Sequence, residues 1–291
     1  MQNQYLIAIV LSAFLHALYN LIMRRSRKGD LSFVTGMFGI ASLIACVVAL
    51  IKGSYLDTAW PSIPYIFGAA FFYILYQAFV FRAYQHGEVS SLYPLTVLSP
   101  IFIPIWAAVA LDEKLSIMTA LGIALTVLGA VLVQQPSLSL DELGQAFRRK
   151  DAHRGAGYAL GASFFYSLGA VSDKWKIGDF PLTLYLALLI SFMFFNALVY
   201  QLTWARTPLL SHLRSHAGTV CLAGTIVYLS FYTFRIALPE VPVSIAVPVR
   251  QIAIVFAIIM GITVLKERFS LCNAVGSLLI MAGIALIHLM G

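Results

Sequence analysis

The chain has 291 residues, of which 60% are hydrophobic and only 11% are charged, and its mean hydropathy is +0.89. Soluble globular domains have roughly a quarter of their residues charged, so this composition excludes a soluble protein and indicates one that lies in a membrane. The net charge of +7 does not indicate a nucleic-acid partner, because the basic residues cluster in short connections between apolar stretches, as the positive-inside bias of membrane proteins predicts.

Ten apolar stretches follow one another along the chain. Each approaches the roughly 20 residues that a helix needs to cross a hydrocarbon core about 30 Å thick. We therefore predict an all-α membrane protein with ten transmembrane helices. The predicted spans are Tyr5–Met23, Leu31–Ile51, Ser62–Tyr84, Val89–Leu111, Ser116–Val133, Ala156–Val171, Phe180–Leu202, Gly218–Ile236, Val243–Leu265 and Ser270–Met290.

One polar stripe runs along the first span, with a polar residue at every fourth position: Ser12, His16, Asn20 and Arg24. On an otherwise apolar helix, such a stripe is expected to face the interior of the bundle. His16 titrates near neutral pH when unperturbed, and we expect no Asp or Glu deep in any span, so His16 is the candidate for proton coupling. A hydrogen-bonded packing histidine is the alternative.

The fourth and ninth spans each contain a proline, Pro94 and Pro248. Proline removes one backbone donor and blocks the carbonyl four residues earlier, and freed backbone groups are tolerated at membrane depth only beside protein or a watery cavity. The two prolines therefore indicate a central ligand site, with simple packing kinks as the alternative. Tyr93, next to Pro94, is a candidate to hydrogen-bond the ligand, although a core or interfacial tyrosine would look identical in sequence.

Arg250 lies two residues beyond the second proline, well inside its span, where insertion scales put the cost of arginine at about 2.5–3.5 kcal/mol. Such a residue requires an anionic partner. The partner is either a carboxylate or phosphate-like group of a substrate, or a protein acid such as Glu88, Glu240 or Asp173. The corresponding residue of the first half is Thr96, so the cavity is expected to be positive on one side and to favour anionic or zwitterionic ligands.

The chain contains an internal repeat, because residues 83–133 align without a gap on residues 237–287, with 14 identities in 51 pairs. Coincident Pro, Glu, Ser and Gly at one constant offset favour a duplication. Each half holds five spans, an odd number, so the second half enters the membrane inverted, which is typical of transporters. We assign residues 5–133 and 155–290 to the two repeats and residues 134–154 to a linker, which the distribution of Lys and Arg places in the cytoplasm.

Both repeats continue through the same turn, Leu-x-Glu-Lys/Arg-x-Ser. Ser116 and Ser270 are predicted to cap the helices that follow, and Glu113 and Glu267 to fix the turns. Four glycines at seven-residue spacing in the fifth and tenth spans predict close helix packing, either between the halves or between protomers. These glycines are Gly122, Gly129, Gly276 and Gly283.

The segments that carry a family resemblance are His16-Ala-Leu-Tyr-Asn20, Gly87-Glu-Val-Ser-Ser-Leu-Tyr-Pro94, Leu111-Asp-Glu-Lys-Leu-Ser116 and Leu265-Lys-Glu-Arg-Phe-Ser270. Together they resemble the drug/metabolite transporter superfamily, EamA type, over essentially the whole chain. The resemblance implies ten helices in two inverted EamA repeats around a central cavity, residence in the bacterial plasma membrane, and transport of metabolites such as amino acids or nucleotide-like solutes.

We therefore expect a secondary transporter that moves a small polar metabolite, anionic or zwitterionic, across the bacterial plasma membrane by alternating access. A non-transporting lipid-handling or regulatory membrane protein is the alternative, and a homodimer is left open. No GxSxG, HExxH or GxxxxGK[ST] motif occurs, so we expect no catalytic residue, metal or cofactor. The candidate substrate-binding residues are His16, Asn20, Tyr93, Pro94, Pro248 and Arg250.

Overall fold

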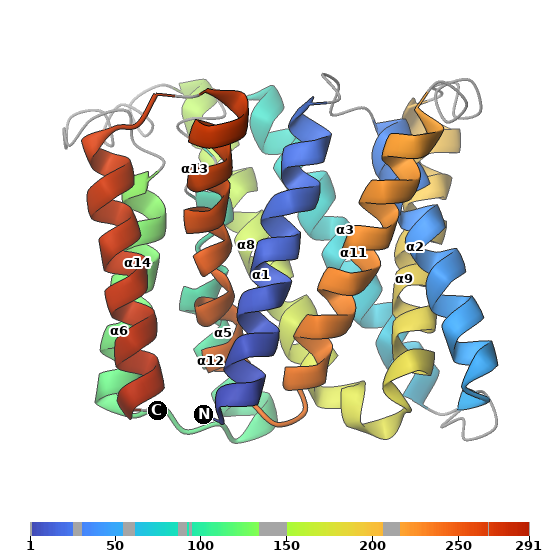
Figure 1. Ribbon diagram of the computed structural model, residues 1–291, viewed down its shortest axis with the longest axis horizontal. Helices are drawn as coiled ribbons and strands as arrows, with labels where there is room; N and C mark the ends of the chain where they lie inside the picture. Colours follow the sequence, from blue (N-terminus) through green and yellow to red (C-terminus); the bar gives the residue numbers. More distant parts are fainter. Residues whose placement is uncertain are drawn as a thin grey trace. The chain divides into compact units, whose positions relative to one another are not determined.

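Figure 1 shows the computed structural model of the chain. The structure describes residues 2–25, 31–54, 62–86, 92, 95–133, 150–205, 216–266 and 268–290. Within these ranges every regular element is helical, which confirms the predicted all-α class.

The helices follow the predicted spans closely. In the first half they are α1 (Asn3–Arg25), α2 (Leu31–Ile51), α3 (Ile63–Gln85), α5 (Ser99–Leu111) and α6 (Ile117–Val133). In the second half they are α8 (Lys150–Lys176), α9 (Leu182–Tyr200), α11 (Ala217–Ala237), α12 (Val243–Arg250), α13 (Ile252–Leu265) and α14 (Leu271–Met290), with short helical turns η3 (Ile177–Asp179) and η4 (Gln201–Ala205).

Seven helical segments of the described chain are long and apolar enough to cross a membrane, and the stretch Val243–Leu265, which contains α12 and α13, is one of them. The helices α5 and α6 are apolar but shorter. At 27 residues, α8 is about 40 Å long. The seven segments together with α5, α6 and α8 correspond to the ten predicted spans.

One prediction about the sixth span is wrong. That span was expected to end at Val171, which left Asp173 outside it, but α8 continues to Lys176 and the Asp173 side chain is fully buried. The polar run that begins at Ser172 resembles a loop in sequence because charged residues are rarely placed inside spans. Here protein groups satisfy the charge, so the helix continues through it.

The chain packs as two compact units. The α6–α14 unit contains Leu75–Val171 and Val241–Gly291, and the α2–α9 unit contains Gln2–Ile74 and Ser172–Glu240. Each unit therefore combines helices from both halves of the sequence, and α3 and α8 contribute one part to each unit. The packing units thus differ from the sequence repeats.

The helices α6 and α14, which correspond in the repeat, pack against each other in antiparallel directions (Figure 1). A Cβ atom at Gly129 would lie 2.5 Å from the carbonyl oxygen of Gly276, and one at Gly283 would lie 2.5 Å from that of Gly122. The predicted close packing at the four glycines is therefore confirmed, and it joins the two halves of one chain. At the far end of the contact, Asn273 Nδ2 donates to the Val133 carbonyl at 3.2 Å.

The helices α2 and α9 form a second antiparallel pair in the other unit. Side-chain hydrogen bonds join Ser32 with Gln201, Ser42 with Ser191, and Ser54 with Thr183. Residue numbers rise along α2 as they fall along α9. Because counterparts from the two halves run in opposite directions in both units, the repeat is inverted, as the odd number of spans predicts.

The turns between the last two spans of each half also match. Asp112 and Lys266, which are 154 residues apart, are the two described non-glycine residues with positive φ, at 53° and 58°, and each ends its helix in the left-handed conformation. The predicted serine caps are confirmed as well. Ser116 Oγ accepts the Thr119 N–H at 3.0 Å, and Ser270 Oγ accepts the Asn273 N–H at 3.1 Å.

Candidate functional site

The ninth span is interrupted at Gln251, directly after Arg250. Pro248 has no N–H group, and the chain continues through tight turns in which the Gln251 N–H donates to the Pro248 carbonyl at 3.0 Å and the Ile254 N–H donates to the Gln251 carbonyl at 2.9 Å. The helices α12 and α13 therefore meet at a break within an apolar membrane span. Discontinuous helices of this kind form the ligand sites of many transporters.

The break also contacts its own counterpart in the first half. Gln251 Nε2 donates to the Val97 carbonyl at 3.3 Å, and Val97 is the residue that aligns with Gln251 in the repeat. Val97 lies in a turn that precedes α5, so a turn interrupts the regular α-helix at the same position in both halves. The two interrupted spans therefore meet at their interruptions within the α6–α14 unit.

Arg250 is half-buried at this meeting point, and Thr96, its counterpart, is 3% exposed. Of the three acids considered as protein partners for Arg250, Asp173 binds Arg235 instead and Glu240 is exposed. Glu88 lies outside the described residues.

The carboxylate of Glu113 holds the start of α12. Its Oε1 accepts the Val243 N–H at 2.8 Å, and its Oε2 accepts the Ser244 N–H at 3.1 Å and the Ser244 hydroxyl at 2.5 Å. A carboxylate at a helix N-terminus satisfies free N–H groups and complements the helix dipole. Glu113 was predicted to fix its own turn, and the structure shows that it also anchors the helix that carries Pro248 and Arg250.

Two of the predicted site residues, Tyr93 and Pro94, lie outside the described residues. So do Ser90 and Glu267, the residues that align with Ser244 and Glu113 in the repeat.

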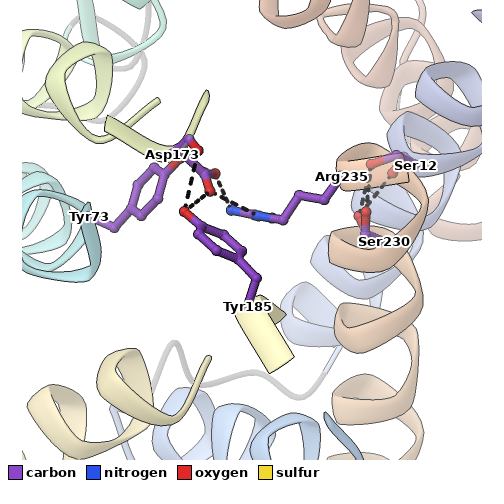
Figure 2. A network of polar contacts seen from close by, with 6 residues as sticks. All are labelled: Ser12, Tyr73, Asp173, Tyr185, Ser230 and Arg235. Carbon is purple, nitrogen blue, oxygen red and sulfur yellow. Dashed lines mark hydrogen bonds and ion pairs between the residues drawn. The ribbon is translucent and has the colours of Figure 1, made fainter. Parts of the chain in front are cut away.

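The polar stripe of α1 divides into two parts. Ser12 is fully buried and exchanges two hydrogen bonds with Ser230 of α11, each hydroxyl donating to the other residue's carbonyl (Figure 2). His16 and Asn20 are half-buried and bond within α1: the Tyr19 hydroxyl lies 2.8 Å from His16 Nδ1, and Asn20 Nδ2 donates to the His16 carbonyl at 2.8 Å. Thus Ser12 joins two helices. His16 and Asn20 belong to the α2–α9 unit, whereas Pro248 and Arg250 belong to the α6–α14 unit.

A buried charge cluster in the α2–α9 unit was not predicted from the sequence (Figure 2). Arg235 of α11 forms a bidentate ion pair with Asp173 of α8, and both side chains are almost completely buried. The hydroxyls of Tyr73 and Tyr185 donate to the same carboxylate at 3.1 and 2.6 Å, and the Arg235 guanidinium lies 4.7 Å from the centre of the Phe231 ring. The cluster joins α3, α8, α9 and α11.

The one signal for this cluster in the sequence was the position of the two charges. Asp173 lies two residues beyond the predicted sixth span, and Arg235 lies inside the predicted eighth span. Because the two residues are 62 positions apart, the sequence does not reveal that they pair. The carboxylate receives four hydrogen bonds from protein groups, so its charge is satisfied within the fold. We interpret the cluster as structural.

Aromatic and charged side chains mark one end of α3 and α8. Tyr65 and Trp175 are about half exposed and pack edge to face, with ring centres 5.5 Å apart. Lys176 Nζ lies 4.9 Å from the centre of each ring. Amphipathic aromatic rings with a neighbouring lysine are typical of the membrane–water interface, so we expect this group to lie at that interface.

Comparison with known proteins agrees with this architecture. A protein of known crystal structure is similar to the chain with a TM-score of 0.76 at 19% sequence identity, over 99% of this chain and 96% of that one, which shows a shared fold. No curated protein sequence matches the chain. The family model of the EamA-like transporter family matches residues 3–134 and residues 153–289, one match for each half. The chain is therefore an integral membrane protein of ten helices in two inverted repeats, and it belongs to the EamA-like transporter family.

Proposed function

We propose that the chain is a secondary transporter that moves a small polar metabolite, anionic or zwitterionic, across the bacterial plasma membrane by alternating access. The observation that carries this proposal is Arg250 at the α12–α13 break, where the interrupted spans of the two halves meet through Gln251 and Val97. In this proposal Arg250 binds the negatively charged group of the substrate.

The charge at the break supports an anionic group over a cationic one. Arginine stays protonated at every physiological pH, and its planar guanidinium can bind a carboxylate or phosphate through two parallel hydrogen bonds. The first N–H groups of α13 start at Ile252, two residues beyond Arg250, and add the partial positive charge of a helix N-terminus. The corresponding position of the first half holds the neutral Thr96, so the repeat supplies no second charge there.

The inverted repeat supports alternating access. Antiparallel counterparts pack within both units, α6 with α14 and α2 with α9. When two inverted copies exchange conformations, the resulting states have similar energies, so a site at their common axis can open to either side. Val97 and Gln251, the residues at the two breaks, correspond in the repeat and contact each other. An axis that relates the two copies would therefore pass between them.

His16 is proposed as the residue that couples transport to protons, because histidine is the residue type whose unperturbed pKa lies nearest to neutral pH. Its test is transport in proteoliposomes against an imposed pH gradient. We expect the gradient to stimulate uptake by the wild type and to have no effect on His16→Gln. Equal stimulation of both proteins would assign coupling to another group.

The function is tested in two steps with purified full-length protein. A thermal-shift screen against amino acids, sugar phosphates, nucleotides and organic cations identifies ligands, because binding to the native state raises the unfolding midpoint. Counterflow of each hit in proteoliposomes then tests transport. We expect anionic or zwitterionic hits that show counterflow. Binding without counterflow would support the alternative of a non-transporting lipid-handling or regulatory protein, and cationic hits alone would contradict the proposed charge of the site.

A further inference from the structure

A shallow, open cavity of about 380 Å³ lies at the surface of the α6–α14 unit, between the C-terminal part of α3 and the N-terminal part of α8. Its lining residues are Phe79, His86, Arg154, Gly157 and Tyr158. Gly157 contributes open space, because a Cβ atom built there has no heavy atom within 4 Å. Nothing in the proposed transport function uses this cavity.

The floor of the cavity is closely packed. Behind it, a Cβ atom at Gly161 would lie 2.6 Å from the Phe79 ring. The Tyr158 ring contacts both Phe79 and His86, with ring centres 5.6 and 5.4 Å apart. Aromatic rings therefore form one wall, and tight helix packing fixes their positions.

The polar part of the cavity is cationic. Arg154 is exposed at its edge, and His86 Nδ1 lies 2.9 Å from the Arg82 carbonyl. A carbonyl can only accept a hydrogen bond, so Nδ1 carries the hydrogen in that bond and a ligand would meet Nε2. The sequence that leads to Arg154 is basic, since residues 148–154 contain Arg148, Arg149, Lys150 and Arg154 against the single acid Asp151.

The cavity lies at the level where lipid headgroups are expected. The apolar window of α3 ends at Val80, and His86 follows about 8–9 Å further along the helix direction. The headgroup region extends about 5–8 Å beyond the hydrocarbon core on each side, so Phe79 lies near the end of the acyl region and His86 near the phosphates. The local excess of Lys and Arg assigns this end to the cytoplasmic leaflet, where anionic lipids attract basic segments.

We propose that this cavity binds the phosphate of an anionic phospholipid headgroup. The Arg154 guanidinium holds the phosphate oxygens, the His86 Nε2 accepts a hydrogen bond from a hydroxyl of the headgroup, and the rings of Phe79 and Tyr158 contact the glycerol and the first methylenes of the acyl chains. The shared chemistry is that of a phosphate anion. A lipid is favoured over free phosphate because the cavity combines a cationic edge with an apolar aromatic wall at membrane depth. The proposal is independent of the transported substrate.

The test is the thermal midpoint and native mass spectrometry of the full chain in detergent, with phosphatidylglycerol, phosphatidylcholine or inorganic phosphate added at equal concentration. We expect phosphatidylglycerol alone to bind and raise the midpoint. Arg154→Gln with His86→Gln should weaken its apparent affinity by about tenfold or more. The matched control is Arg82→Gln, which removes an exposed cation from the same end of α3 without touching the cavity and should leave the affinity within about twofold.

A second variant keeps the charges and fills the space. Gly157→Leu places a side chain in the open cavity, so lipid binding should be lost while the protein without added lipid keeps its midpoint. Undiminished binding to either variant, or an equal loss with Arg82→Gln, would overturn the proposal. An equal response to inorganic phosphate would assign the cavity to a free anion and overturn the lipid assignment.

Discussion

The two packing units each hold an arginine within a membrane span, and the two arginines differ in burial and in the helix that carries them. In the α2–α9 unit, Arg235 is 2% exposed and pairs with Asp173, whose carboxylate also receives two tyrosine hydroxyls. In the α6–α14 unit, Arg250 is half-buried, ends a short helix after Pro248, and lies where the two repeats meet at their breaks.

Burial of the charge and continuity of its helix separate a structural arginine from a functional one. Both arginines carry the same insertion cost, so cost alone does not distinguish them. A charge surrounded by fixed protein donors and acceptors on continuous helices stabilises the fold. A partly accessible charge on an interrupted helix, at the axis of an inverted repeat, has the position of a ligand-binding group.

The largest effect is expected from breaking the pair in the α2–α9 unit. Asp173→Asn leaves Arg235 buried without its counter-ion and should destabilise the protein by about 3–5 kcal/mol, measured as unfolding in detergent micelles. The double variant Asp173→Leu with Arg235→Leu removes both charges and should recover much of the loss. A stable Asp173→Asn protein would contradict the structural interpretation of the cluster.

A smaller loss is expected where the α6 and α14 backbones touch. Gly129→Ala adds a methyl group 2.5 Å from the Gly276 carbonyl oxygen, so the helices must separate, at a cost of about 1–3 kcal/mol. The control is Gly68→Ala, because a Cβ atom there has no neighbour within 4 Å. The thermal midpoint should fall for the first variant and hold for the second, and equal midpoints would exclude close packing at Gly129.

Removing the cap at the start of α12 should act on transport more than on stability. Glu113→Gln loses the negative charge at the Val243 and Ser244 N–H groups, which costs about 1 kcal/mol and loosens the helix that positions Arg250. We expect a several-fold loss of transport with a small change in midpoint. Lys114→Gln, at the exposed next position, is the control. Full transport by Glu113→Gln would show that the contact does not position the site.

The smallest effect concerns Asp179, in the turn after α8. Hydrogen bonds from Ser62 and Lys176 hold the pKa of its carboxyl below the ordinary value. A depressed folded pKa means that the stabilisation is present above the unfolded pKa and is lost as pH falls through the folded one. The group is largely exposed, so the loss should be at most about 0.5 kcal/mol. Unfolding between pH 5 and 3 should be slightly less pH-dependent in Asp179→Asn, and an identical pH dependence would remove Asp179 from this account.

The sequence predicted the features that depend on local patterns or on the constant offset between the two copies of the internal repeat. The serine caps at Ser116 and Ser270 follow from short-range spacing, and the glycine contacts between α6 and α14 follow from a seven-residue pattern on one helix face. The break beside Pro248 was predicted because proline acts on its own turn.

The sequence did not predict features that join distant residues. It offered Asp173 as a partner of Arg250, whereas Asp173 pairs with Arg235, since apolar spans of similar composition do not reveal which helices are neighbours. The reach of Glu113 across 130 residues to Val243 was missed for the same reason. His16 and Asn20 stay predictions as ligand contacts, because the bonds described for them lie within α1.

The most direct test of the central claim is counterflow by Arg250 variants with the substrate identified by the ligand screen. Arg250→Gln should keep a wild-type thermal midpoint without ligand, lose the ligand-induced shift, and lose transport by about tenfold or more, while Arg250→Lys retains part of both. Lys114→Gln should behave as wild type. Unchanged binding and counterflow in a folded Arg250→Gln protein would contradict the role of Arg250 in holding the substrate.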